Sequence, residues 1–347
     1  MQAVVWTAYG PAGTLEVREV PKPSLRERDV LIEVGAATVS AADTEVRQLR
    51  LPGLIRFAFR LYAGILRPRR VTILGQDVAG IVVRTGPLVS RWRVGDEVIA
   101  ATGIRMGGHA EYVRLDERGV MAAKPQNVSF EAAATLAVGG VEALQFIRQA
   151  AIQPGWSVLV NGAGGSIGTV AVQLAAAAGA AVTAVDRPEK HDLLRSIGAR
   201  HVMDHASNVM DPARHRFDVI FDVIGSLPVS RCIEALQPGG ALLVSYPQRQ
   251  HGRRGRGLAE RHGVSLVTSP AGDAAKDLAA LCERVAEGEI VPVVDRVFAF
   301  EQAVDAHCYV ESGMKRGSVV FSTYGTPSSE QAHRGDAAFN SSSWWIL

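Results

Sequence analysis

Apolar positions change their spacing about a third of the way along the chain. Up to about residue 125, short runs of apolar, β-branched residues alternate with glycines and turns, as in residues 29–39, 77–86 and 96–103. A turn at residues 93–98 (RVGDEV) connects two such runs. The pattern predicts a β-rich domain over residues 1–125.

From about Phe130 the spacing becomes helical. Residues 129–150 predict a helix with Ser129 as N-cap and an interruption at Gly139 and Gly140. Beyond it, short apolar strands alternate with segments long enough for helices, which is the pattern of a parallel, doubly wound sheet. The predicted strands are residues 157–163, 181–186, 201–205, 219–225, 241–247 and 264–270.

The last part of the chain adds few elements. Residues 274–289 predict an amphipathic helix, and residues 293–300 and 317–323 predict strands. Residues 325–347 form a polar tail whose Trp344 and Trp345 are expected to pack on the body of the protein or on a neighbour.

Composition excludes several classes of protein. A length of 347 residues favours two domains, and a net charge of +2 with 47% hydrophobic residues is ordinary for a globular protein and argues against nucleic-acid binding by bulk charge. Cys232, Cys282 and Cys308 are far apart, so neither disulfides nor a cysteine zinc site is indicated. With neither a leader-like start nor a long apolar run, we expect a cytoplasmic setting.

A glycine cluster between a strand and a helix carries the first functional signal. Ala163, Gly165 and Gly168 have the spacing A-x-G-x-x-G, and the next strand ends on an acid. Small residues there let the backbone approach a pyrophosphate at the N-terminus of the helix. The predicted cofactor-binding residues of this loop are Ala163, Gly164, Gly165, Ser166, Ile167 and Gly168.

The residues after the second strand bear on the choice of cofactor. Asp186 stands where a carboxylate would accept hydrogen bonds from the adenosine ribose, which favours NADH over NADPH. Arg187 or Lys190 could instead pair with a 2′-phosphate if Asp186 turned away, so NADPH stays open.

On these motifs the chain resembles the medium-chain dehydrogenase/reductase superfamily, specifically its zinc-free quinone oxidoreductase-like branch. The resemblance implies an α/β protein with a GroES-like domain (residues 1–125, completed by 266–324), a Rossmann domain (126–265) and a cofactor in the cleft between them. It also implies a homodimer joined through the sixth Rossmann strand, residues 264–270. The matching stretches include ATVSAADTEVR, LGQDVAGIVVRTG, GGHAEYV, QPGWSVLVNGAGGSIGTVAVQLA and VESGMKRGSVVF.

Departures from the zinc-dependent branch predict that no catalytic metal is used. Ser40 stands at the place of a zinc cysteine and Gln76 at the place of a zinc histidine. Neither side chain is an ordinary zinc ligand. Without a Lewis acid to hold an alkoxide, reduction of an electron-poor acceptor, such as a quinone or an α,β-unsaturated carbonyl, becomes the favoured chemistry.

Three residues are candidates for catalysis. Ser40 corresponds to the asparagine that reaches the nicotinamide in quinone oxidoreductases, so it could donate to a substrate carbonyl, or it could simply cap a turn. Asp43 could orient that segment or serve only the structure. Glu142 replaces a threonine common in relatives, and it could deliver a proton if burial raises its pKa, or pair with an arginine on a helix face.

The resemblance suggests further contacts. His205 follows the third strand on the adenosine side, whereas His109 is expected to be a packed or solvent-facing histidine or a substrate neighbour. Ser318 stands where relatives usually carry a lysine before the last strand. Residues at the carboxyl ends of the fourth and fifth strands are also predicted to bind the cofactor. These are Val223, Ile224, Gly225, Ser245 and Tyr246.

Two stretches, residues 47–70 and 248–262, are rich in arginine. They are expected to be either solvated basic surface or a funnel for an anionic or carrier-bound substrate. Phe57 and Tyr62 lie in the first stretch and could line the acceptor pocket. RNA binding is a weaker interpretation because no RNA-binding motif accompanies the charge.

The sequence therefore predicts an NAD(P)H-dependent oxidoreductase that reduces a quinone or a conjugated enone without a metal or a membrane anchor. Two alternatives remain open. One is a zinc-free alcohol dehydrogenase or ketoreductase, and the other is a cofactor-binding protein without turnover, acting as a structural or RNA-binding partner.

Overall fold

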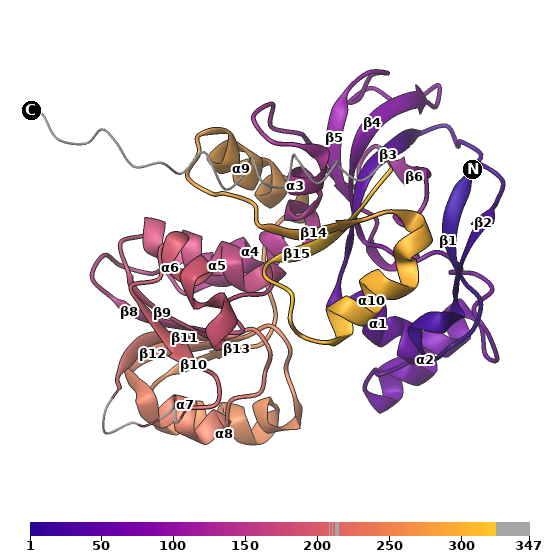
Figure 1. The fold of residues 1–347 in the computed structure, drawn as a ribbon. Coiled ribbons are helices and arrows are strands. Elements are labelled where there is room, and N and C mark those ends of the chain that lie inside the picture. Colours follow the sequence, from indigo (N-terminus) through magenta and orange to yellow (C-terminus); the bar gives the residue numbers. More distant parts are fainter. Residues whose placement is uncertain (208, 210, 212–214, 324–347) are drawn as a thin grey trace, which may run out of the picture.

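The computed structural model describes residues 1–323 except 208, 210 and 212–214, and the tail at residues 325–347, with Trp344 and Trp345, lies outside the described residues. The described residues build two large sheets, each with its own helices, and a separate two-stranded hairpin (Figure 1). Across the described residues, no helix has both the length and the hydropathy that a membrane crossing requires.

The first sheet has seven strands and is built around β3 (Asp29–Val39), an 11-residue strand that pairs with β4, β6 and β15. Its final strand, β15, comes from the end of the described chain, and Val319 lies opposite Val39. Figure 1 shows these late elements beside the N-terminal part. The other strands are β4 (Asp77–Thr85), β5 (Glu97–Ala101), β6 (Tyr112–Asp116), β7 (Val120–Ala123), β14 (Val294–Phe298) and β15 (Ser318–Ser322); β1 (Gln2–Trp6) and β2 (Leu15–Glu19) form a separate hairpin.

Two helices interrupt the region that the sequence pattern predicts as β-rich. The helix α1 (Ala41–Gln48) begins at a capping box formed by Ser40 and Asp43. The helix α2 (Gly53–Ala63) follows Pro52 and ends at Gly64, whose φ of 142° stops the helix. Both were missed because the first is short and the second has apolar residues on its exposed side as well as on the side that packs on the core, so neither shows a single core-facing stripe.

The second sheet has six parallel strands in the order β10-β9-β8-β11-β12-β13. In chain order this is third, second, first, fourth, fifth and sixth, the arrangement of a dinucleotide-binding fold. The doubly wound sheet predicted from the sequence is confirmed. The strands are β8 (Ser157–Asn161), β9 (Ala181–Asp186), β10 (His201–Asp204), β11 (Phe217–Asp222), β12 (Leu236–Val244) and β13 (Ser265–Val267).

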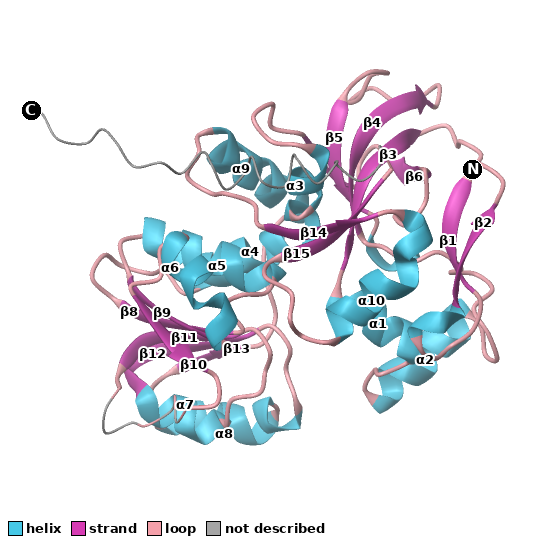
Figure 2. Ribbon diagram, in the orientation of Figure 1, coloured by secondary structure: helices cyan, strands magenta, loops and turns pink. Residues whose placement is uncertain are grey.

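Helices cover both faces of this sheet (Figure 2). One face carries α4 (Val141–Gln149), α5 (Ser166–Ala177) and α6 (His191–Ser196), and the other carries α7 (Val229–Ala235) and α8 (Arg253–Arg261). Strand residues such as Val158, Val160 and Phe221 are consequently fully buried. The remaining helices are α3 (Phe130–Ala134), α9 (Ala274–Ala286) and α10 (Ala303–Glu311).

The helical stretch predicted over residues 129–150 is present, with Ser129 as its N-cap. Its interruption at Gly139 and Gly140 takes the form of a π-helical turn, Leu136–Gly140, between α3 and α4. Such turns often mark functional sites because they displace the residues that follow. Glu142 lies in the first turn of α4, directly after this one.

Candidate active site

The glycine loop connects the end of β8 to the start of α5. Gly162 has a φ of 79°, which favours glycine, and the amide of Gly165 donates to its carbonyl. A Cβ on Gly168 would lie 2.3 Å from the Gly162 oxygen, so the helix and the loop are in backbone contact. Gly165, Ser166 and Ile167 are half-buried, which leaves the helix N-terminus partly open to a ligand.

Asp186, the last residue of β9, lies directly against this loop. One carboxylate oxygen accepts from the Gly164 amide at 2.8 Å, and the other accepts from the Arg187 amide at 2.8 Å. Lys190 brings its ammonium within 2.9 Å of the same carboxylate, and both residues are buried. Asp186, the acid expected to bind the ribose, is therefore already paired with Lys190.

The strand ends next to the loop bring together the other predicted cofactor residues. A Cβ on Gly162 would lie 2.6 Å from a side-chain carbon of Ile224, so residues 223–225 border the loop. The His205 amide donates to the Asp186 carbonyl, while its exposed ring faces Asp204 at 3.0 Å. All of these positions follow the carboxyl ends of parallel strands, where open α/β sheets bind ligands.

Lys315 is a residue of this site that sequence reasoning missed. Its ammonium donates to Ser166 Oγ at 2.8 Å and to the Gly317 carbonyl at 2.9 Å. Burial, followed by the charge of Lys190, lowers the pKa of Lys315 to about 8. The Gly317 amide donates to the Gly164 carbonyl at 2.8 Å, which holds this late segment on the loop. A lysine only three residues before Ser318 was the available signal.

Glu142 forms the second polar centre. Ser245 Oγ, at the end of β12, donates to its carboxylate. Burial raises the pKa of Glu142 above its usual range, and the hydrogen bond from Ser245 partly opposes that shift. An arginine was one expected partner for Glu142, but its partner is the Ser245 hydroxyl.

The next residue, Tyr246, links the two parts of the molecule. Its hydroxyl donates to the carboxylate of Glu45, on α1, at 2.5 Å. Burial, together with Glu45, raises the pKa of Tyr246 to about 12, so the phenol keeps its proton. Because Tyr246 follows β12 and Glu45 belongs to the first part of the chain, this bond spans the space between the two sheets.

Ser40 and Asp43 form a closed pair at the start of α1. Ser40 Oγ donates to an Asp43 oxygen at 2.6 Å, and the Ser40 amide donates to the same oxygen at 2.8 Å. The other oxygen accepts from the Gly75 amide at 2.9 Å, and Asp43 is fully buried. The single hydroxyl proton of Ser40 is thus already committed to Asp43.

Comparisons with known proteins agree with this geometry. An alcohol dehydrogenase GroES-like domain matches residues 26–126, and a zinc-binding dehydrogenase domain matches residues 197–321. The chain is 30% identical over 332 residues to the 2-methylene-furan-3-one reductase of Solanum lycopersicum, an alignment that covers 92% of this chain and 78% of that protein. It is 31% identical over 333 residues to the chloroplastic NADPH-dependent alkenal/one oxidoreductase of Arabidopsis thaliana, covering 92% and 79%.

Among solved structures, the quinone oxidoreductase from Coxiella burnetii superposes with a TM-score of 0.81 at 26% identity, covering 93% of this chain and 99% of that one. The chain is a medium-chain dehydrogenase/reductase. It belongs to the quinone oxidoreductase-like branch of that superfamily and is an oxidoreductase that depends on NAD(P)H.

The name of one matched domain raises the question of zinc in this medium-chain dehydrogenase/reductase. Ser40 and Gln76 stand at the two positions where the zinc-dependent branch carries zinc ligands. The Ser40 hydroxyl donates to Asp43, and the Gln76 amide donates weakly to the Gly103 carbonyl at 3.4 Å. In the described part of the chain, no three histidine, cysteine or acidic side chains are grouped as a metal site. Hydroxyl and amide groups are poor zinc ligands, so these residues do not fit the metal.

The NAD(P)H site, by contrast, fits the residues present. The glycine loop leaves no room for a Cβ at Gly164 or Gly168, where the nearest atoms would be 2.5 Å and 2.3 Å away. The loop is flanked by Lys190 and Lys315, two cations suited to phosphates. The backbone, the helix N-terminus and the two cations together match a bound pyrophosphate.

The predicted substrate residues do not lie together. His109 is fully buried, with Nε2 2.8 Å from the Thr38 carbonyl and its ring against Phe321, which favours the packed role. Phe57, on α2, has 63% of its surface exposed. Tyr62, on the same helix, stacks under the guanidinium of Arg70.

Proposed function

We propose that this medium-chain dehydrogenase/reductase transfers a hydride from NAD(P)H to a quinone or an α,β-unsaturated carbonyl. The observation that carries the proposal is Glu142, a half-buried acid of raised pKa held by Ser245 at the carboxyl edge of the Rossmann sheet. Reducing a conjugated carbonyl needs one proton for each hydride, and an acid of this kind supplies it. Its relatives include a 2-methylene-furan-3-one reductase and an NADPH-dependent alkenal/one oxidoreductase, and a quinone oxidoreductase shares its fold, which supports the same chemistry.

The residues divide the work as follows. The cofactor supplies the hydride when it is bound. The Ala163–Gly168 loop, with Lys190 and Lys315, holds its phosphates, while Ser245 holds Glu142 in place. For an enone, Glu142 gives its proton to the carbon next to the carbonyl after hydride reaches the far end of the double bond; for a quinone it protonates an oxygen.

Ser40 and Asp43 are proposed to shape the acceptor site. Ser40 Oγ donates to the Asp43 carboxylate and accepts from the Asp43 amide at 3.2 Å, so its proton is not free to donate to a substrate. We propose that a substrate carbonyl accepts a hydrogen bond from Ser40 only if the hydroxyl rotates away from Asp43. Asp43 stays fixed by the Gly75 amide during that rotation.

We propose that the site accepts both NADH and NADPH and that the Asp186–Lys190 pair sets the ratio. The carboxylate alone would repel a 2′-phosphate, but Lys190 at 2.9 Å neutralises it and offers the phosphate a cation. Removing Lys190 should weaken the binding of NADPH more than the binding of NADH. Asp186→Ser should shift preference toward NADPH.

The test is an acceptor screen that follows NADH and NADPH oxidation separately with quinones, enones and saturated ketones. Oxidation with quinones or enones, and little with saturated ketones, is the expected outcome. Steady reduction of the oxidised cofactor by alcohols, without turnover of enones, would identify an alcohol dehydrogenase instead. Tight cofactor binding with no turnover across the panel would identify a non-catalytic binding protein.

We also propose that the protein works in the cytoplasm as a homodimer joined through β13. This strand ends the six-stranded sheet, and within the described residues its outer edge has no partner strand. Pairing with the same edge of a second copy would satisfy those backbone groups. Light scattering of the wild type and of a Leu266→Pro variant tests the dimer, and a monomeric wild type would refute it.

A further inference from the structure

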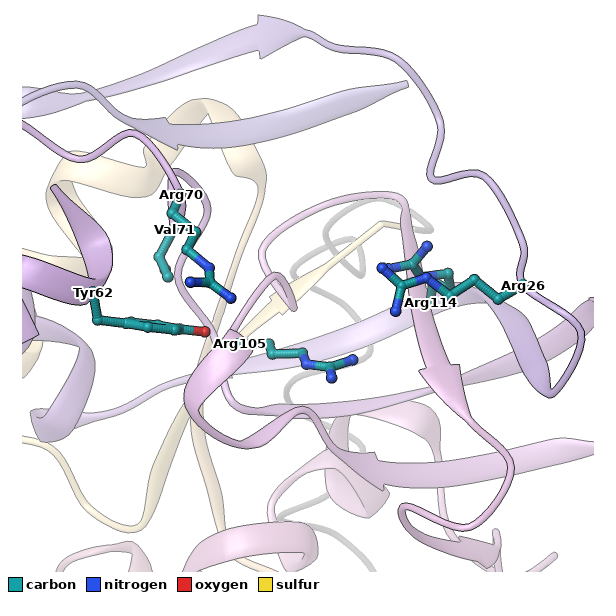
Figure 3. Close-up of a pocket in the computed structure, with 6 residues that line it drawn as sticks. All are labelled: Arg26, Tyr62, Arg70, Val71, Arg105 and Arg114. Atoms are coloured by element: carbon teal, nitrogen blue, oxygen red, sulfur yellow. The ribbon is translucent and has the colours of Figure 1, made fainter.

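A basic pocket lies in the GroES-like part, apart from the residues assigned to hydride transfer. It has a volume of about 310 Å³ and four arginines among its lining residues (Figure 3). The glycine loop, Glu142, Ser245 and Ser40 are not among them. The lining residues are Arg26, Tyr62, Arg70, Val71, Arg105 and Arg114.

The four arginines come from separate parts of the chain. Arg26 precedes β3, Arg70 follows α2, Arg105 ends a short turn after β5, and Arg114 belongs to β6. Figure 3 shows Arg70 above Tyr62 on one side and Arg114 with Arg26 on the other, and Arg105 lies between them. The fold therefore brings together four like charges that are up to 88 positions apart, counting from Arg26 to Arg114.

Nearby carboxylates neutralise only one of the four arginines. Asp29 pairs with Arg114 at 3.2 Å, whereas Asp116 is taken by Arg118 at 2.7 Å. Within the described part of the chain, Arg26, Arg70 and Arg105 form no ion pair with a carboxylate. The adjoining hollow, which Arg26 and Arg105 also line, contains Glu27, Asp29 and Asp116. Gathering three such cations costs free energy through repulsion unless an anion joins them.

Two of the arginines are held in place before any ligand arrives. The Arg70 guanidinium lies 4.6 Å from the centre of the Tyr62 ring, and Arg114 donates to the Ser24 carbonyl at 2.7 Å. Holding these side chains lowers the entropy cost of binding. The Tyr62 hydroxyl adds a neutral donor on the same side of the pocket (Figure 3).

We infer that this pocket binds the phosphoryl group of a ligand other than the redox cofactor. A carboxylate presents one edge and one charge, whereas a phosphoryl group presents three oxygens and nearly two charges. Guanidinium groups on several sides therefore suit the phosphoryl group better. The group could belong to a soluble phosphorylated molecule or to a lipid headgroup, since both offer the same chemistry.

The lipid source has some local support. Beside the pocket, α2 and the segment after it expose Leu54, Ile55, Phe57, Leu61 and Leu66, each by more than half of its surface. Basic side chains next to exposed apolar ones are typical of segments that contact anionic membranes. The binding experiment therefore needs a soluble arm and a vesicle arm.

The soluble arm titrates the full chain calorimetrically with inorganic pyrophosphate. We expect Arg70→Gln/Arg105→Gln to weaken binding at the pocket roughly tenfold or more, because two charge-assisted contacts are lost there, while any binding at the glycine loop stays. The matched control is Arg253→Gln/Arg254→Gln, which removes two exposed arginines of α8 and the same charge. The control should bind as the wild type does.

A second variant separates this pocket from the glycine loop, which could also hold pyrophosphate. Lys190→Ala/Lys315→Ala removes the two cations at the loop and should leave the pocket's binding in place. Loss of all binding in that variant, with full binding in Arg70→Gln/Arg105→Gln, would overturn the inference. So would a wild type that does not bind pyrophosphate at all.

The vesicle arm measures co-sedimentation with phosphatidic acid vesicles against phosphatidylcholine vesicles. Sedimentation with the anionic vesicles that is lost in Arg70→Gln/Arg105→Gln identifies a headgroup. Binding of pyrophosphate without sedimentation identifies a soluble phosphorylated ligand. None of these readouts depends on turnover. The inference about the pocket can therefore be refuted while the proposed reaction is confirmed, and the proposed reaction can be refuted while the pocket is confirmed.

Discussion

At the scale of single residues, the proposed role of Glu142 as proton donor is the most direct to test. Replacing it with glutamine keeps the size and the hydrogen bond from Ser245 but removes the proton donor. We expect kcat with a quinone or enone to fall about 100-fold or more, with little change in KM for NAD(P)H. Steady-state kinetics at constant pH measure both constants, and a glutamine variant with the wild-type kcat would refute the role.

Replacing Ser245 tests whether Glu142 acts as an acid, because a purely structural Glu142 would leave the pH profile of kcat unchanged. Its hydrogen bond lowers the pKa of Glu142, opposing burial, so Ser245→Ala should raise that pKa further. An acid must be protonated to act, and activity is lost as pH rises through its pKa. The alkaline limb of the kcat profile should therefore move to higher pH in Ser245→Ala.

A buried histidine pair makes a separate prediction about stability. Among the described residues, neither ring nitrogen of His307 has a hydrogen-bond partner, and its ring centre lies 5.8 Å from that of His109. Burial, then the charges of His109 and Arg47, depress the pKa of His307 well below its usual range. A depressed histidine pKa means that the unfolded chain binds more protons at acid pH, so stability is lost as pH falls below about 6.5.

His307→Leu should flatten this acid dependence. The free energy of unfolding of the wild type should fall by at most about 1.4 kcal/mol per pH unit for each buried histidine, and the leucine variant should lose one such contribution. Urea titrations between about pH 7.5 and about pH 5.5 measure it. The exposed His262→Gln serves as the control and should keep the wild-type slope.

At the scale of elements, the contact between the glycine loop and α5 can be tested by adding one methyl group. A Cβ on Gly168 would lie 2.3 Å from the Gly162 oxygen and 2.6 Å from the Ala163 Cα, and backbone atoms cannot swing aside. Gly168→Ala should cost about 1–3 kcal/mol of stability and weaken NAD(P)H binding, because the loop is displaced. Thermal melts and fluorescence titration with NADPH measure the two effects.

Gly257 offers the matched control, since it also lies within a helix of the Rossmann part. A Cβ there meets no atom within 4 Å. Gly257→Ala should leave cofactor binding unchanged and raise stability by roughly 0.5–1 kcal/mol, through the lower entropy of the unfolded chain. Equal behaviour of the two alanine variants would show that the loop tolerates the methyl group.

The elements also show how far sequence patterns reach. The Rossmann strands and the glycine loop could be predicted because their signals are local: a strand, a glycine spacing and an acid within 28 residues, from Leu159 to Asp186. The π-helical turn before Glu142 appeared only as a pair of glycines. The helix α2 was missed because its apolar residues lie on both its exposed and its core-packed sides and so do not form a single core-facing stripe.

At the scale of the whole molecule, the features that sequence reasoning missed are contacts between distant segments. Lys315 meets Ser166 across 149 positions, and Tyr246 meets Glu45 across 201. His109 and His307, 198 positions apart, share one buried space. A single sequence holds no local signal for such pairs, because their members meet only when the chain folds. Lys315, for example, lies on the segment that leads into β15, which pairs with β3.

The last prediction concerns Lys315, which the final described segment of the chain brings to the glycine loop. Lys315 arrives on the segment before β15, and its pKa is lowered to about 8, so it loses its charge as the pH rises through that value. If it holds a cofactor phosphate, the dissociation constant of NAD(P)H should rise as the pH passes about 8 in the wild type. Lys315→Met should bind the cofactor more weakly at neutral pH and lack this rise, whereas Lys276→Met, at an exposed position on α9, should follow the wild type. Fluorescence titrations across the pH range decide the matter: if the methionine variant matched the wild type at every pH, the ammonium on the glycine loop would have only a structural role.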